Sequence, residues 1–148
     1  MNVYSKGRLI LAGGVIVNDK KQILLLLKKS HNHYEMPGGK VNLEECEDSE
    51  EPSIEELSKA AEREVYEELG SVELEKLKYF AKIEFTIPDG RKAIGYNFLT
   101  KIISGEPKIN EPELFSDLNY FDISELEDLN IAPNLRLLLP KLRLLENE

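Results

Sequence analysis

The chain is short of cysteine, tryptophan and basic residues, and these shortages restrict its function. Among 148 residues there are one cysteine, no tryptophan, 19 Lys and Arg residues and 28 Asp and Glu residues. A single cysteine cannot form an internal disulfide, and Cys46 stands among acids that would raise its thiol pKa, so we expect no role for it. The net charge of −9 argues against a nucleic-acid polymer as partner. An acidic protein can still bind a small polyphosphate when divalent cations lie between the two.

Long hydrophobic runs are also missing. The apolar runs, such as residues 23–27, are far shorter than the roughly 20 residues that a membrane helix needs. The N-terminus has no charged segment followed by an apolar stretch and a small-residue cleavage site. We therefore expect no membrane partner and a cytoplasmic location. The hydrophobic share of 41% and the length fit one globular domain over residues 1–148.

The pattern of apolar residues predicts strands and two helices. Two pairs of β-rich runs are each separated by a turn sequence: NDKK lies between 9–17 and 22–27, and PDGR between 79–87 and 93–103. In the second turn Pro88 sets φ and Gly90 tolerates a positive φ. A short strand is expected at 119–123, and helices at 54–69 and about 134–145. Strands mixed with helices indicate an α/β (α+β) fold with helices on the faces of a central sheet.

The first predicted helix has clear boundaries. Ser53 and Glu56 form an S-x-x-E capping box, and Gly70 suits the position just after the helix. At 100° per residue, one apolar stripe is predicted to face the core, and it consists of Ile54, Leu57, Ala61, Val65 and Leu69.

Three carboxylates crowd the end of this helix in the sequence REVYEELG. The helical angles place Glu64 and Glu68 at the border of the apolar stripe and Glu67 further out. On a solvent-exposed helix face with stabilising ion pairs, a Lys or Arg would follow each Glu by four residues. Here the residue four positions after Glu64 is Glu68, which carries the same charge. Arg63 can orient a carboxylate but cannot balance three. Hard divalent cations such as Mg²⁺ prefer oxygen ligands, so the pattern favours a metal site.

These residues resemble the signature of the Nudix hydrolases. The family box reads G-x5-E-x7-R-E-U-x-E-E-x-G-U, where U is aliphatic, and REVYEELG with the upstream MPGGKV is similar to it. Two departures occur. Ser71 takes the last aliphatic position, with Val72 one place later, and the first half of the box lies too far from Arg63.

The extra distance fits a ten-residue acidic insertion between Glu45 and Glu55, within a box that spans about 38–72. Counting forward from Gly39, the pattern requires a glutamate at position 45, and Glu45 is there. Counting back from Arg63, it requires a glutamate at position 55, and Glu55 is there. Capping geometry places Glu55 on the helix and slightly favours it as the partner of Arg63, with Glu45 as the alternative. The insertion is interpreted as a solvated loop, and an additional calcium site is a weaker alternative because the twelve-residue loop pattern is missing.

The resemblance covers most of the chain and implies an α/β/α sandwich around a mixed sheet. IPDGR, SGEPKINEPEL, YFDISEL and IAPNLRLLLPKL are similar to the second half of the MutT-type nucleoside triphosphate pyrophosphohydrolases. In that group an additional metal-site glutamate precedes the last strand, which Glu111 matches best, with Glu113 nearby. An asparagine that opens the terminal helix contacts the purine, and Asn134 matches it. A helix N-cap is an equally good and compatible explanation of Asn134.

The resemblance also implies a mechanism, in which water attacks a phosphorus of a nucleoside diphosphate linked to another group. It assigns Mg²⁺, with Mn²⁺ as substitute, to Glu64, Glu67, Glu68 and Glu111 together with the Gly38 or Gly39 carbonyl. Glu64 or Glu111 would act as general base and Arg63 would orient the acids. Lys28 would contact phosphate, although a surface role explains it equally well.

The expected substrate is a (deoxy)nucleoside triphosphate, including an oxidised purine one, cleaved to monophosphate and pyrophosphate. Dinucleoside polyphosphates, ADP-ribose and ADP-sugars are the alternatives. A non-catalytic nucleotide-binding regulatory domain is the alternative from another class. The expected partner is a small-molecule nucleotide, and the chain would act as a monomer or homodimer.

Overall fold

The computed structural model describes residues 1–147, and its elements follow the order of the predicted ones. Both 3₁₀-helices are short, at Leu43–Glu45 and Ile123–Glu127. The strands and α-helices are β1 (Tyr4–Ser5), β2 (Arg8–Ile16), β3 (Gln22–Lys28), β4 (His33–Glu35), β5 (Gly38–Lys40), α1 (Ile54–Leu69), β6 (Glu73–Leu74), β7 (Lys78–Thr86), β8 (Lys92–Thr100), β9 (Ile102–Ser104), β10 (Phe115–Asp122) and α2 (Pro133–Leu145).

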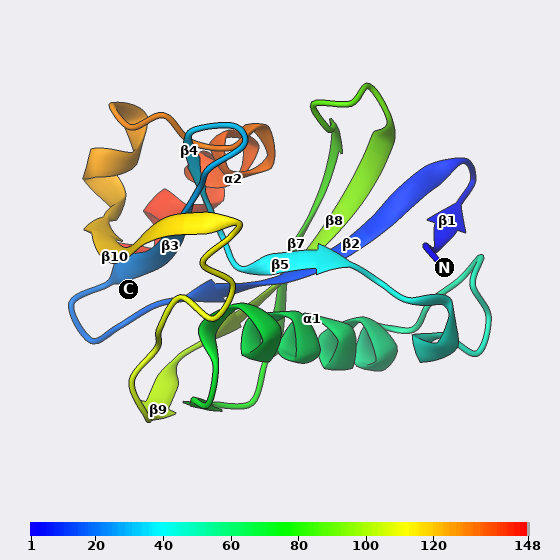
Figure 1. The fold of residues 1–148 in the computed structure, drawn as a ribbon, viewed down its shortest axis with the longest axis horizontal. Helices are drawn as coiled ribbons and strands as arrows, with labels where there is room; N and C mark the ends of the chain where they lie inside the picture. The colour runs from blue at the N-terminus through cyan, green and yellow to red at the C-terminus, as the bar shows by residue number, and fades with distance from the viewer. Residues whose placement is uncertain (148) are drawn as a thin grey trace.

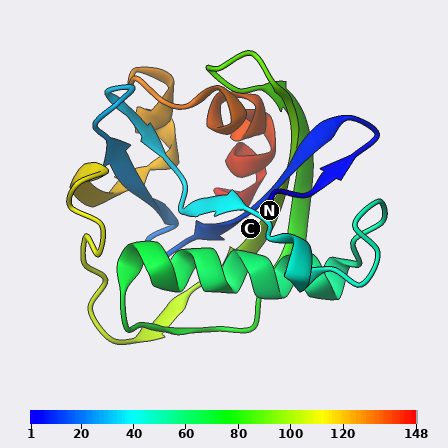
Figure 2. The ribbon, with the colours of Figure 1, turned by 45° about the vertical axis from the view of Figure 1, so that its right-hand side comes forward.

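The largest sheet is mixed and is covered by one helix on each face (Figures 1 and 2). Its strands run in the order β1-β2-β8-β7, with β5 paired to β2. The β2 and β8 strands are parallel, whereas β7 and β8 are antiparallel. Side chains alternate across the sheet. Ile10 and Phe98 pack in the α1 core, and Val15 and Ala81 pack in the α2 core. The predicted α/β/α sandwich is confirmed.

The first predicted hairpin forms only at its turn. Val17 and Ile23 make an isolated antiparallel bridge, and β2 and β3 then enter different sheets. The reason is that both edges of β2 are already occupied, one by β8 and the other by β1 and β5. The β3 strand pairs with β10 and β4 instead.

The other predicted elements are confirmed with small changes. The β7–β8 hairpin turns through Gly90, whose φ is 94°. The α1 helix has the predicted bounds, the Ser53 and Glu56 capping box and Gly70 at its end, with φ 82°. Ile54 is an exception to the predicted stripe because it is 46% exposed at the first helical position, before the side chains that reach the core. Within residues 1–147 no helix is long and apolar enough to cross a membrane.

Candidate active site

The short strand β5 holds the two glycines of the signature against β2. Gly38 pairs with Gly13, and a Cβ on Gly38 would lie 2.7 Å from the Gly13 Cα. A Cβ on Gly13 would lie 2.6 Å from the Pro37 carbonyl oxygen. Backbones this close leave no room for side chains. Glycine is therefore needed on both strands for β5 to lie beside the C-terminal half of α1.

Glu64 approaches the second glycine from α1. A Cβ on Gly39 would lie 2.4 Å from the Glu64 Oε2. The Glu64 side chain is only 14% exposed. Burial raises its pKa above the ordinary value, against the lowering effect of Arg63, and the charges of Glu67 and Glu111 raise it further. The carboxylate thus lies over the Gly39 backbone in a partly desolvated position.

The substitution Gly39→Ala is expected to displace this carboxylate. The added methyl group would meet the end of a flexible side chain, so we expect less than about 1 kcal/mol of lost stability. The rate of the hydrolysis that the resemblance implies should fall roughly tenfold or more, because a displaced Glu64 carboxylate could no longer bind the metal assigned to it. Thermal melting and steady-state kinetics test this. E55A serves as the control, because Glu55 is exposed on the same helix and pairs with Lys59. An unchanged rate in G39A would contradict a role of Glu64 at this site.

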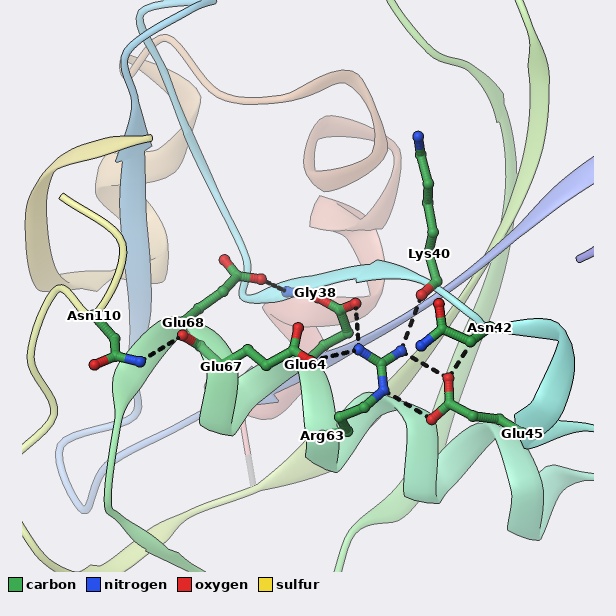
Figure 3. Close-up of polar contacts among 9 residues, drawn as sticks. All are labelled: Gly38, Lys40, Asn42, Glu45, Arg63, Glu64, Glu67, Glu68 and Asn110. Atoms are coloured by element: carbon green, nitrogen blue, oxygen red, sulfur yellow. Dashed lines mark hydrogen bonds and ion pairs between the residues drawn. The ribbon is translucent and has the colours of Figure 1, made fainter. Parts of the chain in front are cut away.

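Arg63 connects three segments of the chain (Figure 3). Its Nε and Nη2 donate to the two carboxylate oxygens of Glu45 at 2.8 and 2.7 Å. Its Nη1 donates to Glu64 Oε1 and Glu67 Oε1 at 2.9 and 3.0 Å. Nη2 also donates to the Lys40 carbonyl at 3.0 Å. The planar guanidinium thus fixes two of the signature carboxylates relative to β5.

The interpretation that favours Glu55 as the partner of Arg63 is wrong. Glu55 is exposed and its side chain pairs with Lys59 at 3.7 Å. Glu45, at the end of a 3₁₀-helix directly after β5, makes the two-pronged contact instead. Burial alone would raise the pKa of Glu45, but hydrogen bonds from Arg63 and the Asn42 amide hold it below its usual value. The insertion therefore follows the glutamate that Arg63 contacts rather than preceding it.

Glu68 is the most deeply buried of the three carboxylates. It is 4% exposed, and its Oε1 accepts a hydrogen bond from the Gly38 amide at 2.8 Å (Figure 3). Burial raises its pKa to about 9, and the charges of Glu35, Glu64 and Glu111 act in the same direction. A buried carboxylate without a cationic partner is costly to ionise. The helical angles predicted this burial correctly.

Glu111 reaches the site because its loop caps the end of α1. The Asn110 amide and side chain donate to the Glu68 and Glu67 carbonyls at 3.0 and 2.9 Å, and the Lys108 amide donates to the Leu69 carbonyl. These bonds satisfy carbonyls that a helix end leaves unpaired. Burial, then the charges of Glu113 and Glu67, raise the pKa of Glu111. Glu113 is exposed on the same loop.

Glu35, at the end of β4, lies beside the candidate site, and no sequence pattern pointed to it. Burial raises its pKa, against the lowering effect of Lys28. Its Oε1 is shielded from solvent and has no hydrogen-bond partner among residues 1–147. The Lys28 Nζ lies 3.8 Å from that oxygen, beyond hydrogen-bonding distance. The positive charge of Lys28 also lowers the pKa of Glu111, so Lys28 is close to both Glu35 and Glu111.

A pocket of about 310 Å³ adjoins β5 on the face of the sheet that α2 covers. Lys28, Gly38, Gly39 and Asn134 all line it, as does Glu35. Asn134 is the second residue of α2 and is not its N-cap, since Ala132 occupies that position without a side-chain bond. The N-cap explanation of Asn134 is therefore wrong, because Pro133 starts the helix one residue earlier. The signature carboxylates Glu64, Glu67 and Glu68 are not part of the pocket lining and lie along the edge of α1.

The residues at this edge fit a bound divalent cation. Within residues 1–147 no three His, Cys, Asp or Glu side chains form a metal cluster by themselves. Arg63 engages the Oε1 atoms of Glu64 and Glu67 and leaves their Oε2 atoms as donors. In the described chain the Glu35 Oε1 accepts no hydrogen bond and has only the Lys28 ammonium, at 3.8 Å, as a positive neighbour. Together with the raised pKa of Glu68, this marks a place where a further positive charge would be stabilising. Water and phosphate oxygens would complete the ligands of a hard cation here.

The comparisons with known proteins agree with this geometry. The NUDIX domain family matches residues 8–142. Among solved structures, the MutT NUDIX hydrolase from Burkholderia pseudomallei is 26% identical with a TM-score of 0.73, over 89% of this chain and 95% of that one. The MutT protein from Methanosarcina mazei Go1 is 18% identical with a TM-score of 0.73, over 98% and 99%.

A third similar structure is the NUDIX domain of Shewanella oneidensis NrtR complexed with ADP ribose, 17% identical with a TM-score of 0.65, over 93% of this chain and 88% of that one. None of the curated proteins matches the chain. The family match extends from β2 into α2 and so includes the signature glycines, the α1 carboxylates and Asn134. The chain therefore belongs to the NUDIX domain family, that of the MutT-type pyrophosphohydrolases which its sequence resembles.

Proposed function

We propose that the protein is a Mg²⁺-dependent pyrophosphohydrolase that cleaves a (deoxy)nucleoside triphosphate to the monophosphate and pyrophosphate. Divalent metals are the usual cofactors of the Nudix hydrolases. The observation that carries the proposal is the position of Glu68, buried without a cationic partner at the Gly38 amide, beside a pocket lined by Lys28 and Asn134. This arrangement can hold metal-bound phosphates at one end and a base at the other.

The roles of the residues follow from their positions. Glu64, Glu67, Glu68 and Glu111 would hold the metal together with the carbonyl of Gly38 or Gly39. A bound Mg²⁺ would supply charge stabilisation for the phosphoryl oxygens and a water of lowered pKa. Glu64 or Glu111 would accept the proton of the attacking water, since the pKa of each is raised above the ordinary value.

Arg63 would keep Glu64 and Glu67 in place through its contacts with both. Lys28 would contact a phosphate from the pocket wall. Its ammonium group lies 3.8 Å from Glu35 and within 5.9 Å of the Phe115 ring centre, so it is held against the protein rather than extended into solvent. Asn134 would contact the base from the first turn of α2.

The substrate class separates this proposal from its alternatives. A panel with Mg²⁺ would include the common and oxidised purine triphosphates, a dinucleoside polyphosphate, an ADP-sugar and ADP-ribose, the ligand of the similar NrtR domain. We expect pyrophosphate release from at least one triphosphate. Turnover of only the other compounds would overturn the choice of substrate. Products formed in ¹⁸O-labelled water would identify the phosphorus that is attacked.

A non-catalytic nucleotide-binding domain is the alternative from another class, and the ADP ribose complex of a similar NUDIX domain supports keeping it. Domains that bind without catalysis do not need a complete row of carboxylates. In this chain Glu64, Glu67, Glu68 and Arg63 are all present and in contact with their neighbours. Nucleotide binding without release of any product from the panel would favour that alternative.

A further inference from the structure

The floor of the pocket is built from paired residues of β2 and β8. Leu11 pairs with Gly95 and Gly13 pairs with Asn97, and all four line the pocket. We call these four residues the pocket floor. Two of them are glycines and one is leucine, so Asn97 has the single polar side chain of the floor. Its amide nitrogen lies 4.0 Å from where a Cβ of Gly95 would stand, which places the amide on the open side of that glycine.

Asn97 is buried without good hydrogen bonds. It is 5% exposed. Its Nδ2 contacts the carbonyls of Ala81 and Gly95 at 3.5 and 3.4 Å, well beyond the usual 2.9–3.0 Å of such bonds. A buried carboxamide costs stability when its groups are poorly paired. Apolar packing would suit this position better, so the structure gains little from an asparagine here.

The direction of the two weak contacts fixes which atom is available. Nδ2 is the atom turned toward the sheet carbonyls, and Oδ1 accepts no hydrogen bond among residues 1–147. Since Asn97 lines the pocket, Oδ1 is the acceptor left for a partner there. Phe85 borders the same space, with Cε1 only 3.3 Å from the Cβ position of Gly95. An aromatic ring beside an acceptor suits a flat base that donates a hydrogen bond.

We propose that Asn97 is a specificity-determining residue, whose Oδ1 accepts a hydrogen bond from an amino or ring N–H group of the nucleobase. This inference rests on the proposed function, because it takes the pocket as the place of the base. Asn97 would read the edge of the base that enters deepest, and Asn134 would contact it from α2. A site built to bond a substrate group discriminates strongly against bases that lack it.

The test compares N97L with the native protein, and N119L is the matched control. Asn119 is an exposed asparagine on β10 whose Nδ2 bonds to Asp117 and which does not line the pocket. Dissociation constants are measured for the four nucleoside monophosphates and for pyrophosphate with Mg²⁺, and kcat/KM for the four triphosphates. N97L should weaken the preferred base roughly 10- to 100-fold and flatten the ranking of the bases. Pyrophosphate binding should change less than about twofold, and N119L should match the native protein.

Each outcome separates the two proposals. An active enzyme in which N97L keeps the native ranking of bases would overturn the role of Asn97 alone. Nucleotide binding that depends on Asn97, without hydrolysis, would overturn the proposed function and support the inference. A native protein that binds no nucleotide would overturn both. If N97L does not melt cooperatively, N97S replaces it, since a serine hydroxyl is too short to reach the same partner and should show the same loss.

Discussion

Replacing Glu68 by Gln is expected to slow hydrolysis by roughly a thousandfold, about 4 kcal/mol of transition-state stabilisation, while the fold stays intact. A neutral amide has nearly the same shape, and its oxygen can still accept the Gly38 hydrogen bond that Glu68 accepts at 2.8 Å. What is lost is the negative charge that would hold a metal. Steady-state kinetics at saturating Mg²⁺ and thermal melting measure the two effects separately.

The matched control is E55Q, because Glu55 lies on the same helix, is exposed and pairs only with Lys59 among its charged neighbours in the described chain. E55Q should keep the native rate. An E68Q protein that hydrolyses substrate at the native rate would contradict the metal assignment of Glu68. A rate loss accompanied by loss of the cooperative melting transition would instead assign Glu68 a purely structural role.

The same residue gives the metal-free protein an unusual dependence on pH. The pKa of Glu68 is about 9 in the folded chain, above the ordinary 4.5 of the unfolded chain. A raised carboxyl pKa means that the folded state binds more protons, so the stability from Glu68 is complete below about pH 4.5 and is lost as the pH rises toward 9. Chemical denaturation at several pH values, with EDTA present to remove metal, should show this decline in the free energy of unfolding. The decline should be shallower in E68Q and unchanged in E55Q. A decline of equal slope in E68Q would contradict the assigned pKa.

Arg63→Lys is expected to have the second largest effect, on both rate and stability. Lysine keeps the charge but loses the planar fork that bonds Glu45, Glu64 and Glu67 together. We expect roughly a hundredfold loss of rate because two carboxylates are no longer oriented. The guanidinium is 27% exposed, so solvent screening limits the loss of unfolding free energy to about 2 kcal/mol.

Chemical denaturation and kinetics of R63K test this, with R143K as the control. Arg143 forms an exposed pair with Glu127 on the far side of the fold from the signature, and its replacement should change stability by less than about 0.5 kcal/mol. E45Q should reproduce part of the R63K loss and E55Q none of it. An E55Q protein that is more affected than E45Q would contradict the observed partner of Arg63.

The sequence was sufficient where local periodicity decides the structure. The α1 bounds follow from Ser53 and Gly70, and the helical angles placed Glu68 on the core side. The partner of Arg63 could not be identified from the sequence, because the insertion leaves two candidate glutamates. Glu45 fits the spacing from Gly39, and Glu55 fits the spacing from Arg63. The folded structure resolves the choice, because the 3₁₀-helix that follows β5 places Glu45 within hydrogen-bonding distance of Arg63.

Residues brought in by long-range pairing could not be predicted. Glu35 faces the site because β4 pairs with β3, with Glu35 opposite Leu26. Asn110 caps a helix that ends about forty residues before it, a contact for which no local pattern exists. The separation of β2 from β3 depends on the strands β1, β5 and β8, which occupy both edges of β2. Such features follow from the assembled fold rather than from any short window of sequence.

The hydrogen bond between Arg63 and Glu45 also determines how the chain between them can vary. The contact fixes the start of this segment, and the Ser53 cap fixes the beginning of the helix at its other end. The intervening acidic residues leave β5 and return to α1 without entering the row of carboxylates. The number of residues between Glu45 and Ser53 can therefore change without moving the carboxylates of α1. A signature that counts residues from Gly39 to Arg63 includes the length of this loop. The contact between Glu45 and Arg63 does not depend on that length.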